Sequence, residues 1–312
     1  MQTSARLNEV YKNASVMPFD DGSKIVFFSD VHRGDNSLSD DFARNRHIFF
    51  HALDFYYEAG FSYFEVGDGD EMWENPNYNH ITTAHPAVFD VLKRYHMNDR
   101  MYMLFGNHNM ALSNPAFVKN NLSESFNDDT EKMEPLFPNL KVYEAIRLKH
   151  LATEQEIFIV HGHQGDFLND QWWRVSFFII RYFWRFMHVL GVNYAASPAK
   201  NQHIRHKIEK SYNKWLAHHQ EIMLICGHTH RAKFPAANDQ PYFNTGCCMH
   251  PRGITCLELK EGEITLINWH MHSRKDGMLY IKRSVLKGPT PIVNFMRCLD
   301  GNTGNNRRRK ER

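Results

Sequence analysis

The chain has 312 residues, of which 42% are hydrophobic and 23% are charged, so it is long enough to bury a sizeable core. Its formal net charge of +2 lacks the strongly basic balance of a nucleic-acid-binding protein, and we expect no nucleic-acid partner. We expect one domain over residues 1–300, with a helical insert at about 167–220. Residues 301–312 contain a basic run and are expected to form a flexible, solvated tail.

The N-terminus lacks a charged head followed by an apolar stretch. No secretion signal is therefore expected, and we predict a cytoplasmic protein. The five cysteines lack the C-x-x-C spacing of many metal and redox sites and lie mostly within apolar stretches. Reduced thiols in the core are the expected state.

Strands and helices are predicted to alternate through the first hundred residues. Apolar runs predict strands at 24–29, 61–66 and 101–105, and helical periodicity predicts helices at 42–59 and 86–98. Such alternation implies a parallel sheet covered by helices. Further strands are predicted at 140–148, 156–160, 222–226, 242–244, 254–259 and 263–269, with a hairpin turn at 260–262. We expect an α/β fold in which two sheets pack together with helices outside.

Five short polar segments punctuate this pattern. They are Ser29-Asp30-Val31-His32, Gly67-Asp68, Gly106-Asn107-His108, His161-Gly162-His163 and Gly227-His228-Thr229-His230. The first four directly follow apolar runs, where buried strands are expected to end and loops to begin. Because the carboxyl ends of strands in an open α/β sheet form the crevice where ligands bind, residues distant in the sequence can converge there. The segments therefore predict a metal site.

The side chains of these segments suit two divalent ions. The oxygen ligands would come from Asp30, Asp68 and Asn107, and the imidazoles from His32, His161, His228 and His230. This mixture suits Mn, Fe or Zn better than Ca or Mg. A carboxylate between the two ions can bridge them, and Asp68 is the candidate for this role. Two ions about 3.5–4 Å apart can activate a water and clamp a phosphoryl group, so we predict phosphoester hydrolysis by a metal-bridging hydroxide.

The order of these segments resembles the calcineurin-like metallophosphoesterases, whose signature is D-x-H, G-D, G-N-H-[DE], H and G-H-x-H. The matching residues span positions 30 to 230. The resemblance implies two packed mixed sheets flanked by helices, and two ions, with Mn expected and Fe or Zn as alternatives. It implies one ion held by Asp30, His32, Asp68 and His230, and another held by Asp68, Asn107, His161 and His228. It also implies that His108 protonates the leaving oxygen or stabilises the transition state.

One position departs from that signature. The acid that usually follows the histidine is replaced by Asn109. An acid there would orient and charge the imidazole of His108, so the replacement leaves the pKa of His108 and the rate of the reaction open. This is the one feature that favours a rival hypothesis, a binding or scaffold protein that retained the fold and lost catalysis.

A narrower resemblance concerns the segment Gly67–Trp73. It is similar to the G-D-x-x-E-x-W block of bacterial UDP-diacylglucosamine pyrophosphatases, which cleave a nucleotide-sugar lipid at the membrane surface. Those enzymes usually carry G-N-R-D where this chain has Gly106-Asn107-His108-Asn109. A phosphorylated small molecule and a lipid-linked substrate are therefore both retained as hypotheses.

The stretch between His161 and Gly227 is predicted to be a helical cap. Its first half, 172–190, is rich in aromatic residues, and Arg174, Arg181 and Arg185 fall on one helical stripe. These three arginines and His163 are candidate substrate-binding residues. Three coverings for the apolar face remain open: ordinary packing, a cap over the metal site, or peripheral contact with a membrane.

Overall fold

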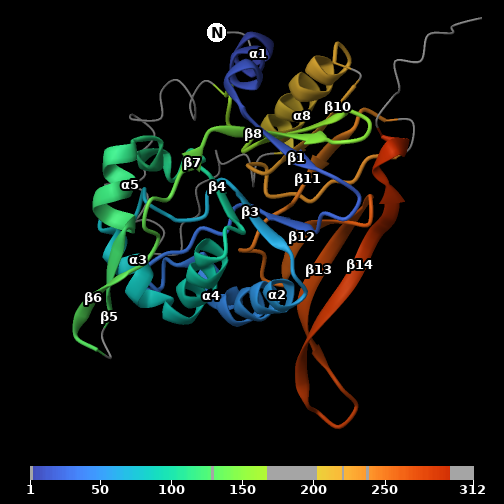
Figure 1. Ribbon diagram of the computed structural model, residues 1–312. Coiled ribbons are helices and arrows are strands. Elements are labelled where there is room, and N and C mark those ends of the chain that lie inside the picture. Colours follow the sequence, from blue (N-terminus) through green and yellow to red (C-terminus); the bar gives the residue numbers. More distant parts are fainter. Residues whose placement is uncertain (1–2, 128–129, 167–201, 220, 237–238, 296–312) are drawn as a thin grey trace, which may run out of the picture.

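A computed structural model describes residues 3–127, 130–166, 202–219, 221–236 and 239–295 of the chain. The first half of the predicted cap, with Arg174, Arg181 and Arg185, lies outside the described residues, as does the predicted tail. Two large mixed sheets form the centre of the molecule, and helices lie on their outer faces (Figure 1). The predicted α/β class with two packed mixed sheets is confirmed.

The larger sheet has seven strands in the order β14-β13-β12-β2-β3-β4-β7. They are β2 (Ile25–Phe28), β3 (Ser62–Val66), β4 (Met101–Leu104), β7 (Val142–Tyr143), β12 (Ile254–Lys260), β13 (Glu263–Ser273) and β14 (Leu279–Pro291). The four strands from β2 to β7 run parallel, whereas β12, β13 and β14 form an antiparallel extension. The predicted hairpin turn joins β12 to β13, and its central residues Glu261 and Gly262 both have positive φ, as a tight two-residue turn requires.

The smaller sheet has five strands in the order β1-β8-β9-β10-β11. They are β1 (Ser15–Phe19), β8 (Ala145–His150), β9 (Glu156–Val160), β10 (Ile222–Cys226) and β11 (Tyr242–Asn244). Only the β8–β9 pair is antiparallel in this sheet. The single strand predicted at 140–148 is in fact two, because the chain passes from β7 in one sheet to β8 in the other at Glu144. A small hairpin of β5 (Glu124–Asn127) and β6 (Lys132–Pro135) lies at one side.

Helices cover the outer face of each sheet (Figure 1). The described helices are α1 (Thr3–Asn13), α2 (Arg46–Glu58), α3 (Tyr78–Ala84), α4 (Pro86–Met97), α5 (Pro115–Leu122) and α8 (Gln202–Leu216), with short 3-10 turns η1 (Asp41–Asn45), η2 (Met110–Ser113) and η5 (Ile292–Asn294). The predicted helix at 42–59 begins as the turn η1, whose first amide groups are capped by the side chain of Asp40, and continues as α2. Helices α2 and α4 lie on the larger sheet, and α1 and α8 lie on the smaller one.

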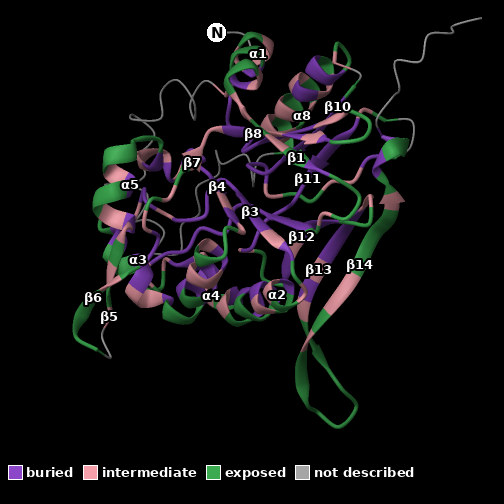
Figure 2. Ribbon diagram, viewed as in Figure 1, coloured by how far each residue is buried: buried purple, intermediate pink, exposed green. Residues whose placement is uncertain are grey.

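The strands divide their side chains between an inner core and two outer cores. In β2, Ile25 and Phe27 face the other sheet, whereas Val26 and Phe28 face the helices of the larger sheet. In β9, Ile157 and Ile159 point to the same inner core, and Phe158 packs towards α1 and α8. This alternation follows from the two-residue period of a strand. Central strands are buried on both faces, whereas the far end of the β13–β14 hairpin is exposed (Figure 2).

We expect the inner core to contribute much of the stability. Phe64 is 2% exposed, stacks on Tyr102 with ring centroids 4.5 Å apart, and contacts Phe27. Phe64→Ala should lower the free energy of unfolding by about 3–5 kcal/mol, because it leaves a cavity between the sheets. The measurement is urea unfolding followed by circular dichroism. Phe126→Ala, at a side chain that is 41% exposed, is the control; an equal loss in both variants would contradict the assignment of the inner core.

Candidate metal centre

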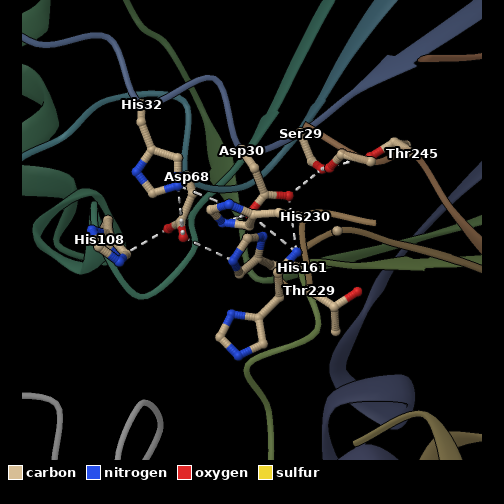
Figure 3. A network of polar contacts seen from close by, with 12 residues as sticks. Ser29, Asp30, His32, Asp68, His108, His161, Thr229, His230 and Thr245 are labelled. Atoms are coloured by element: carbon tan, nitrogen blue, oxygen red, sulfur yellow. Dashed lines mark hydrogen bonds and ion pairs between the residues drawn. The ribbon is translucent and has the colours of Figure 1, made fainter. Parts of the chain in front are cut away.

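The five polar segments lie at the carboxyl ends of five strands. Three of them follow β2, β3 and β4 of the larger sheet, and two follow β9 and β10 of the smaller sheet. The two sheets therefore bring their strand ends to one place, where Asp30, Asp68, His161 and His230 face one another (Figure 3). This is the convergence that the apolar runs and strand order predicted.

Backbone hydrogen bonds hold these loops together. Amides of the first segment donate to the second: Asp30 N to Gly67 O at 3.1 Å, and His32 N to Asp68 O at 3.0 Å. In the same way Gly227 N donates to His161 O at 2.8 Å, which joins the fourth segment to the fifth. The relative positions of the side chains are thus fixed by the backbone as well as by side-chain contacts.

Five of the seven predicted ligands have backbones in the left-handed region. Their φ angles lie between 51° and 64°, and the residues are Asp30, His32, Asp68, His228 and His230. This conformation is uncommon for residues other than glycine, and such residues cluster at functional sites. All five residues lie in the loops that follow β2, β3 and β10.

Two glycines allow neighbouring loops of the site to approach each other closely. A Cβ atom on Gly106 would collide with the carboxylate of Asp68, and on Gly227 it would collide with Ser29 and Asp30. The glycines of the G-N-H and G-H-x-H segments are therefore required by packing, in addition to any role in a turn.

The ligand atoms form two clusters that meet at Asp68. The first contains Asp30, His32 and His230, in which His230 Nε2 lies 3.1 Å from Asp30 Oδ1. The second contains Asp68, His161 and His228, in which His161 Nε2 lies 3.1 Å from Asp68 Oδ2. The same Oδ2 atom lies 3.8 Å from His32 Nε2 of the first cluster. One carboxylate is therefore within reach of both clusters.

The donor set fits divalent metal ions. Among the described residues, four of the buried atoms expected to bind metal have no hydrogen-bond partner: His32 Nε2, Asn107 Oδ1, His161 Nε2 and His228 Nε2. Buried polar atoms are normally paired, so four such atoms on the loops of one site indicate a missing partner. Imidazole nitrogens and amide or carboxylate oxygens are ligands for Mn, Fe and Zn.

Two buried carboxylates carry the negative charge of the site. Burial raises the pKa of Asp30, but His230 and His161 outweigh it, and the pKa is lowered to about 2. Burial likewise opposes ionisation of Asp68, and the neighbouring His161, His108 and His32 hold its pKa well below the usual range. Both groups are therefore ionised at neutral pH. His228 N also donates to Asp30 Oδ2 at 2.9 Å, and His108 N donates to Asp68 Oδ1 at 2.8 Å.

The candidate catalytic residue His108 lies at the rim of the site. Its ring stacks on Trp73 with centroids 4.0 Å apart and planes inclined by 19°. Its Nδ1 atom lies 2.7 Å from Glu71 Oε2, and the same oxygen lies 2.8 Å from Nδ1 of His32. Burial lowers the pKa of His108, but Glu71 and Asp68 outweigh it and raise the pKa to about 9.

Sequence reasoning did not assign a role to Glu71. The residue lies three positions after Asp68, within the Gly67–Trp73 block that carried the narrower resemblance. Its place in this block could have indicated a role at the site. The contact of its carboxylate with two histidines from different loops, however, is visible only in the fold.

A buried ion cluster lies beside the candidate metal ligands. Arg33 is fully buried and binds Glu65 through two nitrogens, at 2.7 and 3.0 Å, and Asp70 Oδ1 through Nε at 2.7 Å. Tyr63 and Tyr78 donate their hydroxyls to the same two carboxylates. Asp70 belongs to the same loop as Asp68, and Arg33 directly follows His32. The cluster therefore joins the loop after β3 to the loop after β2.

The substrate-binding residues proposed from the sequence are only partly described. His163 is fully buried beside His161 and His228, with ring centroids 5.5 and 6.4 Å away. Burial and those two histidines hold its pKa well below the usual range, so its imidazole is neutral. The described part of the predicted insert contains the helix α8, as its helical character predicts, and Tyr212 OH donates to Gln164 O at 3.1 Å, close to the fourth segment. Arg174, Arg181 and Arg185 remain predictions outside the described residues.

The comparison with protein families agrees with these observations. The sequence profile of the calcineurin-like phosphoesterases matches residues 23–232, which is more than half of the chain. The match includes all five polar segments. The chain therefore belongs to the calcineurin-like phosphoesterase family, and it is a metal-dependent phosphoric ester hydrolase.

The solved structures to which the chain is similar are distant from it in sequence and in structure. A predicted phosphoesterase from Streptococcus pneumoniae is 13% identical, with a TM-score of 0.33, over 84% of this chain and 97% of that one. Vacuolar protein sorting 29 from Cryptosporidium parvum is 14% identical, with a TM-score of 0.33, over 86% and 99%. A cold-active protein-tyrosine phosphatase from a psychrophilic Shewanella species is 11% identical, with a TM-score of 0.39, over 88% and 83%. No curated protein sequence matches this chain.

Among the described residues, no helix has the length and apolar character needed to cross a membrane. The four described cysteines, Cys226, Cys247, Cys248 and Cys256, are buried free thiols, as expected.

The buried Arg33 cluster should be essential for stability. Arg33→Met leaves the carboxylates of Glu65 and Asp70 buried without their cation, so the free energy of unfolding should fall by about 3–5 kcal/mol. Arg94→Met is the matched control, because Arg94 binds Asp54 and Glu58 at the surface, with a side chain that is 42% exposed. That pair should contribute at most about 1 kcal/mol. Urea unfolding of both variants tests this, and similar losses would contradict the special role of the buried cluster.

Proposed function

We propose that the protein is a dinuclear metal-dependent phosphoesterase that hydrolyses a phosphate ester or a pyrophosphate. The observation that carries this proposal is the position of Asp68, whose Oδ2 atom lies within 4 Å of His32 Nε2 and His161 Nε2, one from each cluster. Asp30, His32 and His230 would complete the site of one ion, and Asn107, His161 and His228 the site of the other. Mn is the expected ion, with Fe and Zn as alternatives.

Bound divalent ions would lower the pKa of a water molecule and neutralise negative charge on the phosphoryl group. The chain itself supplies two ionised carboxylates, which keep the site attractive to cations, and imidazoles whose Nε2 atoms point into it. The site lies at the edge where the strand ends of both sheets meet, so a substrate approaches from the loop side.

His108 is proposed to hold the proton that the leaving oxygen receives. In the metal-free chain, Glu71 and Asp68 raise the pKa of His108, which favours its doubly protonated imidazole, and its side chain is 23% exposed and so accessible from outside. The stacking of Trp73 on the ring limits its rotation. A protonated imidazole beside the phosphoryl group can also stabilise the charge of the transition state.

The substrate class has two candidates. One is a phosphorylated small molecule, and the other is a nucleotide-sugar lipid of the kind that UDP-diacylglucosamine pyrophosphatases cleave. Glu71 and Trp73, which belong to the shared G-D-x-x-E-x-W block, both contact His108, and this supports a related arrangement around the leaving group. We also propose that Arg174, Arg181 and Arg185 of the cap bind the substrate. The proposed location is the cytoplasm, with peripheral contact to a membrane. A screen of the Mn-loaded protein with aryl phosphates, cyclic nucleotides, nucleotide sugars and phosphoproteins separates the two candidates.

The metal stoichiometry tests the dinuclear proposal. We expect about two ions per chain when the protein is saturated with Mn and analysed by elemental mass spectrometry, since each cluster offers three or more ligands. Asp68→Asn should lower this number, because the shared carboxylate loses its charge. His272→Ala, at an exposed histidine of the β13–β14 hairpin, should leave it unchanged. A wild-type value that never exceeds one ion per chain contradicts the proposal.

Turnover tests the role of His108. His108→Ala should lower kcat about 10²–10⁴-fold while the metal content stays near the wild-type value, because the residue contacts the substrate and is not assigned as a ligand. Asp68→Asn should lower both kcat and metal content. The assays are phosphate release and elemental analysis of the same preparations. A His108→Ala variant that hydrolyses its best substrate at the wild-type rate would show that the assignment is wrong. A wild-type protein that hydrolyses none of the substrates would favour the scaffold hypothesis.

A further inference from the structure

The residue that follows His108 cannot serve its imidazole. Asn109 is fully buried, and its Oδ1 atom accepts the backbone amide of Gly106 at 2.6 Å. This bond closes the turn that carries Asn107 and His108. The usual position of the orienting acid is therefore used to hold the backbone of the loop.

A different carboxylate reaches the imidazole instead. Glu71 Oε2 lies 2.7 Å from Nδ1 of His108 and 2.8 Å from Nδ1 of His32. A carboxylate at this distance accepts the Nδ1–H of each ring, which fixes the tautomer and leaves Nε2 of each ring for the metal or the substrate. The two rings lie 4.6 Å apart and are inclined by 79°, so one oxygen can serve both.

The position of Glu71 is itself fixed. Its second oxygen, Oε1, accepts the backbone amide of Trp73 at 3.2 Å, and its own amide donates to Arg33 O at 2.9 Å. The side chain of Arg33 is in turn held in the buried ion cluster by Glu65 and Asp70. The carboxylate is therefore anchored to the core independently of the rings that it contacts.

We propose that Glu71 is the positioning residue of His108, in the role of the acid that Asn109 replaces, and that it links His108 to the metal ligand His32. The inference rests on the proposed function of His108. It also explains why the change at position 109 is compatible with catalysis: the orienting carboxylate comes from the loop after β3 rather than from the loop after β4.

The variant that tests this proposal is Glu71→Gln. A glutamine has the same shape, but only one of its two terminal atoms is a hydrogen-bond acceptor. Its NH₂ group must therefore face either the backbone N–H of Trp73 or the Nδ1–H groups of both imidazoles, which are donors as well. We expect kcat for phenyl phosphate, whose leaving oxygen needs a proton, to fall about 10–100-fold. The loss for 2,4-dinitrophenyl phosphate should be far smaller, because that leaving group departs without a proton. The metal content under saturating Mn should remain at the wild-type value.

Glu74→Gln is the matched control. Glu74 lies in the same segment and also acts on His108 through its charge. If Glu71 acted on His108 through its charge alone, both variants would lose more activity on phenyl phosphate than on 2,4-dinitrophenyl phosphate. If Glu71 positions His108, only Glu71→Gln should show this difference. His108→Ala should reproduce the pattern of Glu71→Gln, and the double variant should lose little more than His108→Ala, because the two residues act as one unit.

Two results would overturn the proposal. One is an equal loss for both esters, and the other is a loss that excess Mn restores, which would mean that Glu71 acts only through His32 and its ion. If the wild type hydrolyses neither ester, the proposed function fails instead, and a measurement without substrate decides the role of Glu71. The carboxylate-bound Nδ1–H of His108 should give a low-field proton NMR signal that is absent in His108→Ala and in Glu71→Gln. A signal that persists in folded Glu71→Gln contradicts the proposal, and Glu71→Asp, which is too short to reach both rings, replaces that variant if it does not fold.

Discussion

The burial of two ionised carboxylates, Asp30 and Asp68, is the constraint on which the rest of the site depends. Each lies at the end of a central strand and is at most 1% exposed. Burial without partners would disfavour the charged form strongly, and two such groups in one site also repel each other. The structure compensates with imidazoles and with one backbone amide for each carboxylate, from His228 and His108. The same negative charge makes the site suitable for cations.

The backbone contributes to this arrangement through strain. Residues other than glycine in the left-handed region cost about 1–3 kcal/mol each in unfavourable cases, and five of the candidate ligands adopt it. Such conformations persist only where the surroundings determine them. Here the strands before the loops are buried on both faces, and amides of one loop bond carbonyls of the next. The packed sheets therefore supply the stability that holds the ligand loops in an unfavourable conformation.

The central strands and the candidate ligands could be predicted from the sequence, because apolar runs and short motifs are local features of the chain. Strands β9, β10 and β11 match their predicted ranges, since short apolar runs define buried strands. The exposed strand β14 had no such signal, and the break at Glu144 depends on a change of sheet that no local pattern records. The same holds for the site: motif order predicted the candidate ligands, whereas Glu71 reaches His32 and His108 only through the path of a loop. The roles of the cap arginines remain predictions.

The segment from Glu65 to Trp73 explains how ligand position and imidazole position are linked. Its acids alternate in direction: Glu65 and Asp70 bind the buried Arg33, whereas Asp68 and Glu71 face the site. Because Arg33 neutralises charge on the inner side, the outer side keeps a negative charge that the imidazoles and metal ions can use. A shift of this segment would move the candidate ligand Asp68 and the partner of His108 together. The spacing between the candidate ligand Asp68 and the imidazole of His108 is therefore set by one short, internally anchored stretch of chain, and not by the loop that carries His108 alone.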